Sequence, residues 1–412
     1  MFYGWWIVGA CFVISLSVHG VIGFGFTALI EPLRSEFQWS YAQIALASSL
    51  RGVEVGLLAP IVGLLVDRWG PRRLMLGGAI LVGLGLAALS QATSLSMFYA
   101  IFAAVALGMT AVSPTVTMTT VANWFHRKVG TATGIMHSGV GFSGLMIPVV
   151  VLLIDDLGWR TAMVVLGFCL LGIILLLSLL VRHRPEQYGL LPDGEADTAV
   201  VLDEGLVSSG DASRDISARE AVRSRAFWHI ALAMMFQIML VSAVVTHMLP
   251  YLSSVGLGRT TASLIASAVP LSSVLGRLSF GWLSDRIDRR RIMVGGYAMM
   301  SLGMLFLTLA AGGNPGLLVP FVALFSVGFG GNAIVRAAIV REYFGRRSFG
   351  TIHGFIMGVA VVGHLSGPPL AGWVFDTWRS YQGIWFVFSA FALISLILIA
   401  TVPSLRSRSD RW

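Results

Sequence analysis

The chain alternates between long apolar stretches and short polar segments along almost its whole length. A helix that crosses a bilayer needs roughly 20 consecutive apolar residues. The pattern therefore predicts an all-α integral membrane protein with twelve transmembrane helices. Their expected boundaries are 6–29, 42–66, 74–92, 97–121, 130–153, 160–182, 227–251, 262–284, 292–311, 317–340, 349–372 and 381–402. The sequence Ser40-Tyr-Ala-Gln43 fits a capping box that starts the second of these helices.

One polar segment occurs twice, at positions about half the chain apart. Gly63-Leu-Leu-Val-Asp67-Arg68-Trp-Gly70-Pro-Arg72-Arg73 follows the second span, and Gly281-Trp-Leu-Ser-Asp285-Arg286-Ile-Asp288-Arg289-Arg290-Arg291 follows the eighth, 218 residues later. Repetition at a fixed offset indicates an internal duplication, and parallel repeats of this size occur in secondary transporters. We therefore expect two six-helix halves, at 1–182 and 227–412.

The segment 183–226 between the halves is the only long hydrophilic stretch of the chain. It is rich in Asp, Glu, Gly, Ser and Arg and shows no apolar periodicity until about Ala218, so we expect a mobile tether. A short amphipathic piece from Ser217 to Arg225 is expected to follow it at the membrane interface.

The basic residues predict the orientation of the spans. Of the 28 Lys and Arg residues, 21 fall in the loops on one side and four on the other, and three lie inside spans. Because basic residues concentrate in cytoplasmic loops, both termini and the central loop are expected in the cytoplasm. This distribution also accounts for the net charge of +8, so no nucleic-acid partner is expected.

Composition excludes several classes of protein. Only 12% of the residues are charged, against about 25% in soluble domains. Cys11 and Cys169 lie in apolar runs and predict neither a disulfide nor a metal site. The chain carries no nucleophile–base, metal-ligand or nucleotide motif, so no enzymatic activity, cofactor or metal is expected. The expected partners are the lipid bilayer, a small organic anion and protons, with a monomer as the default.

Twelve spans, a long central loop and the duplicated Gly-x-x-x-Asp-Arg-x-Gly-type segment together resemble the major facilitator superfamily. Four shorter motifs are similar to its monocarboxylate porter and oxalate/formate antiporter group: Phe2-Tyr-Gly4-Trp5-Trp6, Asn123-Trp124-Phe125, Ser272-Ser-Val-Leu-Gly276-Arg277 and Tyr343-Phe344-Gly345. The resemblance implies a secondary active transporter of small organic anions, foremost monocarboxylates such as lactate or pyruvate, that works by alternating access with proton coupling. It also implies a multi-pass plasma membrane protein, which in bacteria means the inner membrane.

The duplicated segments place acids beside arginines at the predicted cytoplasmic ends of two helices. Such clusters can latch the two halves of a transporter in one state and release them in another. The residues expected to form this conformational latch are Asp67, Arg68, Arg72, Asp285 and Arg286. The alternative is that the arginines only hold these loops in the cytoplasm.

Arg277 is the foremost candidate for substrate binding. It precedes Asp285 by eight residues, which places it about 12 Å from the cytoplasmic end of its helix, and no acid lies within one turn on that helix. A guanidinium that faces a cavity can hold a carboxylate in a bidentate fork, and the resembling porters carry an arginine at the matching place. A structural ion pair with Glu54 is the alternative.

The other two intramembrane arginines are less decisive. Arg51 and Glu54 are three residues apart and share a helix face, so they form either an internal ion pair or a functional pair in which Arg51 binds the anion and Glu54 carries a proton. Arg336 lies roughly one turn from the predicted cytoplasmic end of the tenth span. It is expected either to snorkel to the interface or to act as a cytoplasmic gate.

Histidines and one amide complete the set of candidates. His19, His137 and His247 lie inside predicted spans and are proton-coupling candidates, although any of them can instead be a hydrogen-bonded packing residue. His364 lies in a glycine-rich stretch, 354–367, and is a candidate for substrate binding, as is Asn332. Pro114 in the fourth span and Pro148 in the fifth are expected to kink their helices. The glycines of the fifth span are expected to allow close helix packing.

Two departures from the resembling group bear on the mechanism. Animal monocarboxylate transporters carry a lysine in the first span, where this chain has Phe24, and an acid one turn before the arginine, where it has Ser273. The oxalate antiporter pairs its arginine with a lysine in span eleven, where His364 is the nearest basic group here. Carboxylate exchange and drug or metabolite efflux therefore stay open as alternatives. An excess of three buried arginines over one glutamate favours anions, and a transport-inactive sensor is disfavoured because the central loop has no recognisable signalling domain.

Overall fold

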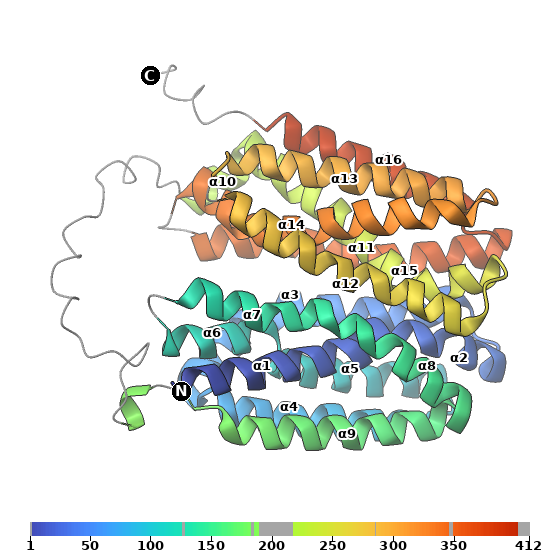
Figure 1. Ribbon diagram of the computed structural model, residues 1–412, viewed down its shortest axis with the longest axis horizontal. Coiled ribbons are helices and arrows are strands. Elements are labelled where there is room, and N and C mark those ends of the chain that lie inside the picture. The colour runs from blue at the N-terminus through green and yellow to red at the C-terminus, as the bar shows by residue number, and fades with distance from the viewer. Residues whose placement is uncertain are drawn as a thin grey trace. The chain divides into compact units, whose positions relative to one another are not determined.

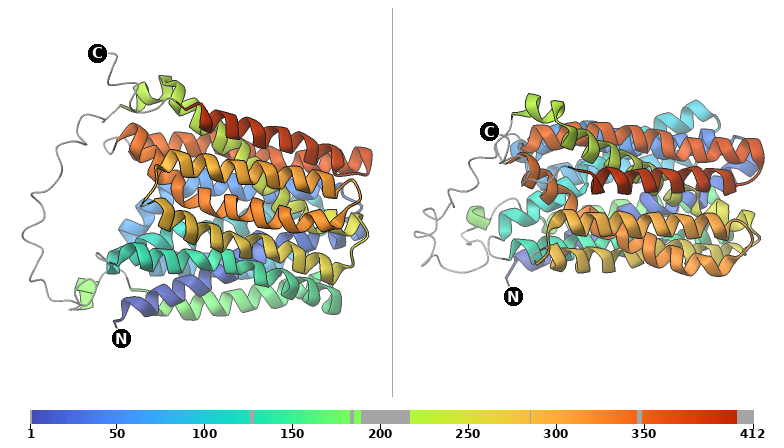
Figure 2. Two further views of the ribbon diagram at one scale, coloured as in Figure 1. Left: turned by 45° about the horizontal axis from the view of Figure 1, so that its top comes forward. Right: turned by 90° about the horizontal axis from the view of Figure 1, so that it is seen from above.

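The computed structural model describes residues 2–125, 128–182, 185–188, 217–284, 286–345 and 349–402. These residues are helical, with no strand among them, and the helices are long and run side by side within each part of the chain (Figures 1 and 2). Eleven helices in the described ranges are long and apolar enough to cross a membrane. The 29-residue helix α3 (Tyr41–Trp69) coincides with the remaining predicted span. The predicted all-α membrane fold is therefore confirmed.

The chain forms two compact units. The first comprises the described residues of 1–202 together with 248–271, and the second comprises those of 203–247 and 272–412. The helices of the N-terminal half are α1 (Gly4–Val18), α2 (Ile30–Phe37), α3, α4 (Pro71–Leu89), α5 (Leu95–Ala111), α6 (Pro114–Trp124), α7 (Val129–Phe142), α8 (Met146–Leu157) and α9 (Trp159–Leu180). Those that follow are α10 (Ala218–Arg223), α11 (Arg225–Ser254), α12 (Arg259–Ser284), α13 (Arg289–Ala310), α14 (Leu318–Phe344), α15 (Phe349–Trp378) and α16 (Gln382–Ala400).

Three of the predicted spans are interrupted helices. The first continues from α1 through a π-helical turn (His19–Phe24) and a 3₁₀ turn (Gly25–Leu29) into α2, so it ends eight residues later than predicted. The fourth breaks into α5 and α6 directly before Pro114. The fifth breaks at a 3₁₀ turn (Ser143–Leu145) directly before α8, and Pro148 is the third residue of α8. Proline removes a helical hydrogen bond and clashes with the preceding turn, which explains why both prolines lie at interruptions, as predicted.

Local capping fixes two helix starts. Ser40 and Gln43 form the predicted capping box at the start of α3. A second capping box joins Ser217 and Glu220 at the start of α10, which matches the short piece expected there. Each box satisfies backbone N–H groups that have no partner inside the helix.

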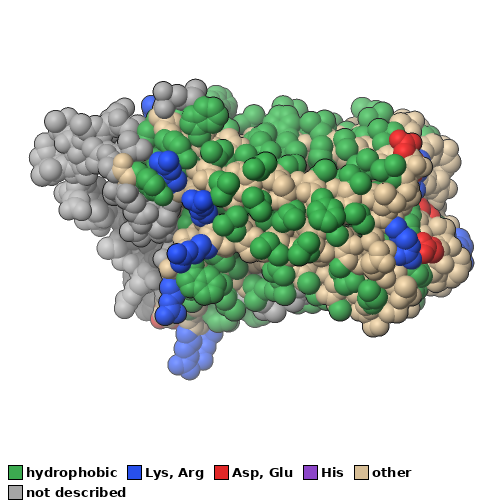
Figure 3. Space-filling model, turned by 90° about the horizontal axis from the view of Figure 1, so that it is seen from below, with side chains coloured by type: hydrophobic (Ala, Val, Ile, Leu, Met, Phe, Trp, Pro, Cys, Tyr) green, Lys and Arg blue, Asp and Glu red, His purple; other side chains and the backbone are tan. Residues whose placement is uncertain are grey.

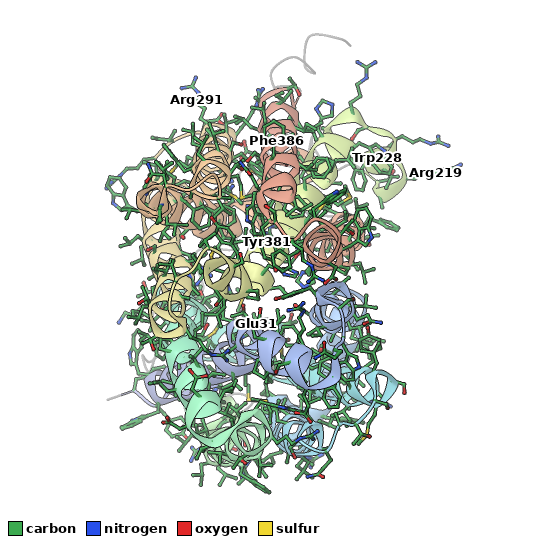
Figure 4. All side chains as sticks on the ribbon, turned by 90° about the vertical axis from the view of Figure 1, so that its right-hand side faces the viewer. Glu31, Arg219, Trp228, Arg291, Tyr381 and Phe386 are labelled. Atoms are coloured by element: carbon green, nitrogen blue, oxygen red, sulfur yellow. The ribbon has the colours of Figure 1, made fainter. Side chains whose placement is uncertain are left out.

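Large apolar side chains cover the outside of the helices. Exposed side chains such as Leu64, Val319 and Phe386 are typical of a surface that meets lipid rather than water. On the face drawn in Figure 3, apolar groups form a broad band, Lys and Arg gather at one end, and acidic groups are seen at the other. Viewed end-on, Arg219 and Arg291 extend outward from the second unit, whereas Tyr381 lies inside it (Figure 4). This distribution agrees with a membrane-spanning protein.

Glycines allow α12 and α14 to pack with their backbones almost in contact. A Cβ atom added to Gly276 of α12 would lie 2.0 Å from the backbone oxygen of Val327 on α14. Conversely, a Cβ atom on Gly330 would lie 2.0 Å from the backbone oxygen of Ser273. Small residues at helix crossings allow this close approach in membranes, so the Gly276-Arg277 motif fixes the position of its arginine through the glycine.

The segment 248–271 is held to the first unit by polar contacts. The Arg259 Nε atom lies 2.8 Å from an Asp155 carboxylate oxygen at the end of α8, and its Nη2 donates to the Ala28 backbone oxygen at 3.0 Å. The Leu249 N–H, one residue before Pro250 in α11, donates to the Thr27 hydroxyl at 3.3 Å. These contacts explain why the end of α11 and the first half of α12 group with the N-terminal helices.

We expect Gly276→Ala to destabilise the protein by about 1–3 kcal/mol, because the added methyl group meets an immovable backbone oxygen. Gly295→Ala on α13 is the matched control, since no atom lies within 4 Å of a Cβ atom there. Thermal unfolding of both variants in detergent tests this prediction. Equal unfolding temperatures would show that the α12–α14 contact is looser than described.

We expect Asp155→Asn and Arg259→Gln each to lower stability by at most about 1 kcal/mol, because a half-exposed ion pair is screened by solvent. The double variant should be no less stable than the less stable of the two single variants, because both substitutions remove the same interaction. Asp156→Asn, at the neighbouring exposed acid, is the control. Fully additive losses in a double-mutant cycle would contradict the pairing.

Candidate functional site

Arg277 lies inside the second unit with much of its guanidinium unsatisfied. The residue is only 8% exposed, and its Nε and Nη1 atoms are buried without a hydrogen-bond partner in the part of the chain that the structure describes. It precedes the end of α12 by seven residues, which corresponds to about 10 Å along the helix. None of the ion pairs found among the described residues involves it. A buried guanidinium without a counter-charge can accept an anionic ligand.

The neighbours of Arg277 on α12 are neutral. Ser273, one turn earlier, is fully buried, and its backbone packs against Gly330 of α14. The proposed alternative partner, Glu54, has a side chain outside the described residues, and so has Arg51. The substrate role of Arg51 and the proton role of Glu54 therefore remain predictions.

The predicted latch is described only in part. The side chains of Arg68, Arg72 and Arg286 are exposed, while those of Asp67 and Asp285 lie outside the described residues. The guanidinium of Arg286 stacks over the Trp282 ring, 3.7 Å from its centre, a cation–π contact not expected from the sequence. Within the second unit this loop is tied to its neighbours, because Arg289 pairs with Glu342 and Arg290 donates to the Ala400 backbone oxygen.

Arg336 lies deeper than its predicted position one turn from a helix end. The helix α14 continues to Phe344, four residues past the predicted boundary, so Arg336 is eight residues from the end. Its Nε atom is buried and has no hydrogen-bond partner among the described residues. The guanidinium interacts electrostatically with Tyr297 of α13 and His353 of α15. The burial of Nε fits a guanidinium that faces the bundle, while snorkelling to the interface and a cytoplasmic gate both stay predictions for this residue.

A hydrogen-bonded polar group lies next to Arg336. The Tyr297 hydroxyl donates to Gln237 Oε1 of α11 at 3.1 Å, and Gln237 Nε2 lies 3.3 Å from the Met300 sulfur. Asn332 Nδ2 contacts the same sulfur at 3.7 Å. Its Oδ1 has no hydrogen-bond partner within the described ranges and lies next to Gly296, where an added Cβ atom would come within 2.2 Å of it. This geometry fits Asn332 as a packing residue between α13 and α14.

His247 is held by two hydrogen bonds inside the second unit. Its Nε2 lies 2.8 Å from the Pro368 backbone oxygen and its Nδ1 lies 3.0 Å from the Tyr381 hydroxyl. A carbonyl oxygen can only accept, so Nε2 carries the proton and Nδ1 of the neutral ring accepts from Tyr381. Since the residue is fully buried, this arrangement satisfies a neutral imidazole that joins α11, α15 and the start of α16.

The remaining candidate histidines lie on three different helical segments. His19 is in the π-helical turn after α1, with Nδ1 3.0 Å from the Ser15 backbone oxygen. His137 of α7 and His364 of α15 are each partly buried. Within the described ranges, no three His, Cys, Asp or Glu residues come together as metal ligands.

Sequence reasoning missed Gln237, Tyr297 and His353 as members of one polar group. The available signal was the presence of polar side chains inside apolar spans seven, nine and eleven. Sequence alone does not show that these spans face one another, so only the structure brings the three side chains together.

We expect Tyr381→Phe to destabilise the protein by about 1–3 kcal/mol, because it leaves a buried imidazole nitrogen without a donor. The control is Tyr343→Phe, which removes a hydroxyl that makes no hydrogen bond to the described residues. Thermal unfolding checks the difference. Unchanged stability together with a shifted pH profile of transport would contradict this role and favour His247 as a proton carrier.

Comparison with known proteins agrees with this architecture. The Major Facilitator Superfamily profile matches residues 6–258 and 239–411. Monocarboxylate transporter 12-B of Danio rerio is 28% identical over 420 residues, covering 96% of this chain and 86% of that protein. Monocarboxylate transporter 13 of Bos taurus is 25% identical over 422 residues, covering 97% and 89%.

Two solved transporters share the fold. A bacterial homologue of the human lysosomal transporter Spinster has a TM-score of 0.75 at 16% identity and is matched over 100% of this chain and 98% of its own. The nucleoside transporter NupG has a TM-score of 0.75 at 14% identity, over 97% and 100%. The chain belongs to the Major Facilitator Superfamily, and within it the chain is similar to the monocarboxylate transporter group.

Proposed function

We propose that the protein is a secondary active transporter of small organic anions, foremost monocarboxylates of the size of lactate or pyruvate. The observation that carries this proposal is Arg277, a buried guanidinium whose Nε and Nη1 have no hydrogen-bond partner among the residues that the structure describes. A carboxylate can accept two parallel N–H bonds from such a group. The names of the monocarboxylate transporter 12 and 13 relatives support the same substrate class.

The charges inside the membrane support an anion over a cation. The predicted spans contain Arg51, Arg277 and Arg336 against Glu54 alone. A cationic drug would meet like charge there, and a buried like-charge contact costs several kcal/mol. Efflux of cationic drugs is therefore the weaker alternative.

Transport is proposed to proceed by alternating access, with both termini and the central loop in the cytoplasm. The duplicated halves and the basic loops support this arrangement. The contacts of Arg259 with Asp155 and Ala28 would then have to break and re-form in each cycle. Glu54, His19 and His137 are the proposed carriers of a coupled proton, His364 is a proposed substrate-binding residue, and His247 is proposed to be structural.

Carboxylate exchange is the second candidate function. It is favoured by Ser273, a neutral residue one turn before Arg277. Without an ionisable group at that position, a second carboxylate rather than a proton would neutralise Arg277 during the return step. Dependence of uptake on an internal carboxylate, in the absence of a proton gradient, would distinguish exchange from symport.

We expect Arg277→Gln to reduce uptake of labelled pyruvate into proteoliposomes by about 30-fold or more, because the carboxylate loses its charged partner. Arg277→Lys should retain part of the activity, since it keeps the charge but loses the fork. Arg223→Gln, at an exposed arginine of α10, serves as the control for charge removal. Wild-type uptake by a folded Arg277→Gln variant would remove Arg277 from the site.

A further inference from the structure

A second cationic group lies within the second unit, apart from Arg277. It consists of Arg336 on α14, whose guanidinium lies within range of electrostatic interaction with His353 on α15 and with the Tyr297 hydroxyl on α13. Tyr297 is anchored in turn by its hydrogen bond to Gln237. Three helices thus bring a permanent cation, an imidazole and a phenol hydroxyl together.

The surroundings of this group are apolar. Val335 and Ile339 flank Arg336 on its own helix, and Phe280, Ile352 and Ile356 belong to the same buried cluster. An intramembrane charge in such surroundings is costly, so it normally faces a partner or marks an ion pathway. No acid pairs with Arg336 among the described residues, and its Nε lacks any hydrogen bond.

The N-terminal half of the chain does not contain a counterpart of this group. Arg73-Leu-Met-Leu-Gly-Gly78-Ala79 matches Arg291-Ile-Met-Val-Gly-Gly296-Tyr297, and Gly130-Thr-Ala-Thr-Gly134 matches Gly350-Thr-Ile-His-Gly354. Aligning Trp124-Phe125 with Tyr343-Phe344 pairs Thr117 with Arg336. The counterparts of Tyr297, Arg336 and His353 are therefore Ala79, Thr117 and Thr133. The helix framework of the first half has no tyrosine, arginine or histidine at these positions. We therefore infer that these side chains have a role specific to the second half.

The position of Arg336 relative to Arg277 follows from the helix contact. Gly276 of α12 packs between Val327 and Gly331 of α14, so these residues lie at one level. Counted from this contact and from that of Gly330 with Ser273 at about 1.5 Å per residue, the backbone of Arg336 lies roughly 3–9 Å further along the helix direction than that of Arg277, and each arginine precedes the end of its own helix by seven or eight residues. The two arginines therefore start from different levels of the bundle.

We propose that Arg336, His353 and Tyr297 form a second binding site for a carboxylate anion, on the side of Arg277 that faces the C-terminal ends of α12 and α14. The guanidinium holds the carboxylate, and the imidazole and hydroxyl border the site. Under the proposed orientation this is the cytoplasmic side, and the site is the last one that an entering anion occupies before release. The proposal rests on the proposed function only for the class of anion.

Equilibrium binding of labelled pyruvate to the purified full-length protein tests this site. The wild type should bind two pyruvate molecules per chain, and Arg336→Gln and Arg277→Gln should each bind one. Arg336→Lys is the control for misfolding, because it keeps the positive charge at the site. It should bind pyruvate there about tenfold more weakly, since lysine lacks the bidentate geometry of the guanidinium. Arg223→Gln should bind two, as the matched surface control.

The outcomes separate this site from the proposed function. One pyruvate per wild-type chain, lost in Arg277→Gln and kept in Arg336→Gln, would overturn the second site and leave the proposed function intact. If the wild type binds one pyruvate and only Arg336→Gln abolishes that binding, the site at Arg336 is supported and Arg277 is not part of a pyruvate site. A lower unfolding temperature of Arg336→Gln with unchanged stoichiometry would overturn the proposal in favour of an internal ion pair. No binding by the wild type would overturn both.

Discussion

Buried positive charge, for which the described residues supply no matching acid, is the constraint on which the interior of the second unit depends. A guanidinium inside a bilayer costs several kcal/mol unless an anion, a cavity or water compensates it. In soluble cores a comparable charge normally occurs as an ion pair, and removing one partner is strongly destabilising. Arg277 and Arg336 are both unsatisfied at Nε among the described residues, so a transported anion is the simplest compensating charge. The negative charge of a bound substrate would then neutralise buried positive charge in the second unit.

The duplication separates framework from function. Features that both halves share are those that shape the helices: the charged segments at 63–73 and 281–291, the glycine pairs at the start of α4 and α13, and the Gly-Thr-x-x-Gly repeat. Features found in one half only are polar and lie inside the bundle, foremost Arg277, Tyr297, Arg336 and His353. Glycine contacts connect the two sets, because Gly276 and Gly330 set the distance between the helices that carry the two arginines. The framework therefore positions the charges without supplying them.

The sequence predicts the helices well because a bilayer imposes one length and one periodicity on every span. It also predicts the capping box at Ser40 and the interruptions at Pro114 and Pro148, since these follow from local chemistry. It ends the tenth helix four residues too early, because the length of α14 is set by packing rather than by hydropathy. It does not identify the neutral role that the structure suggests for His247, because both hydrogen-bond partners come from distant segments of the chain. The partners of Arg277 depend on tertiary contacts in the same way.

We propose that the protein recognises its substrate by the negative charge of a carboxylate group. Uptake of labelled pyruvate and lactate into proteoliposomes, competed by a panel of carboxylates and by their neutral amides, tests it most directly. We expect saturable uptake that carboxylates inhibit and amides do not, driven either by an inward proton gradient or by a preloaded carboxylate. Equal inhibition by acids and amides, or no uptake under either driving force, would contradict it.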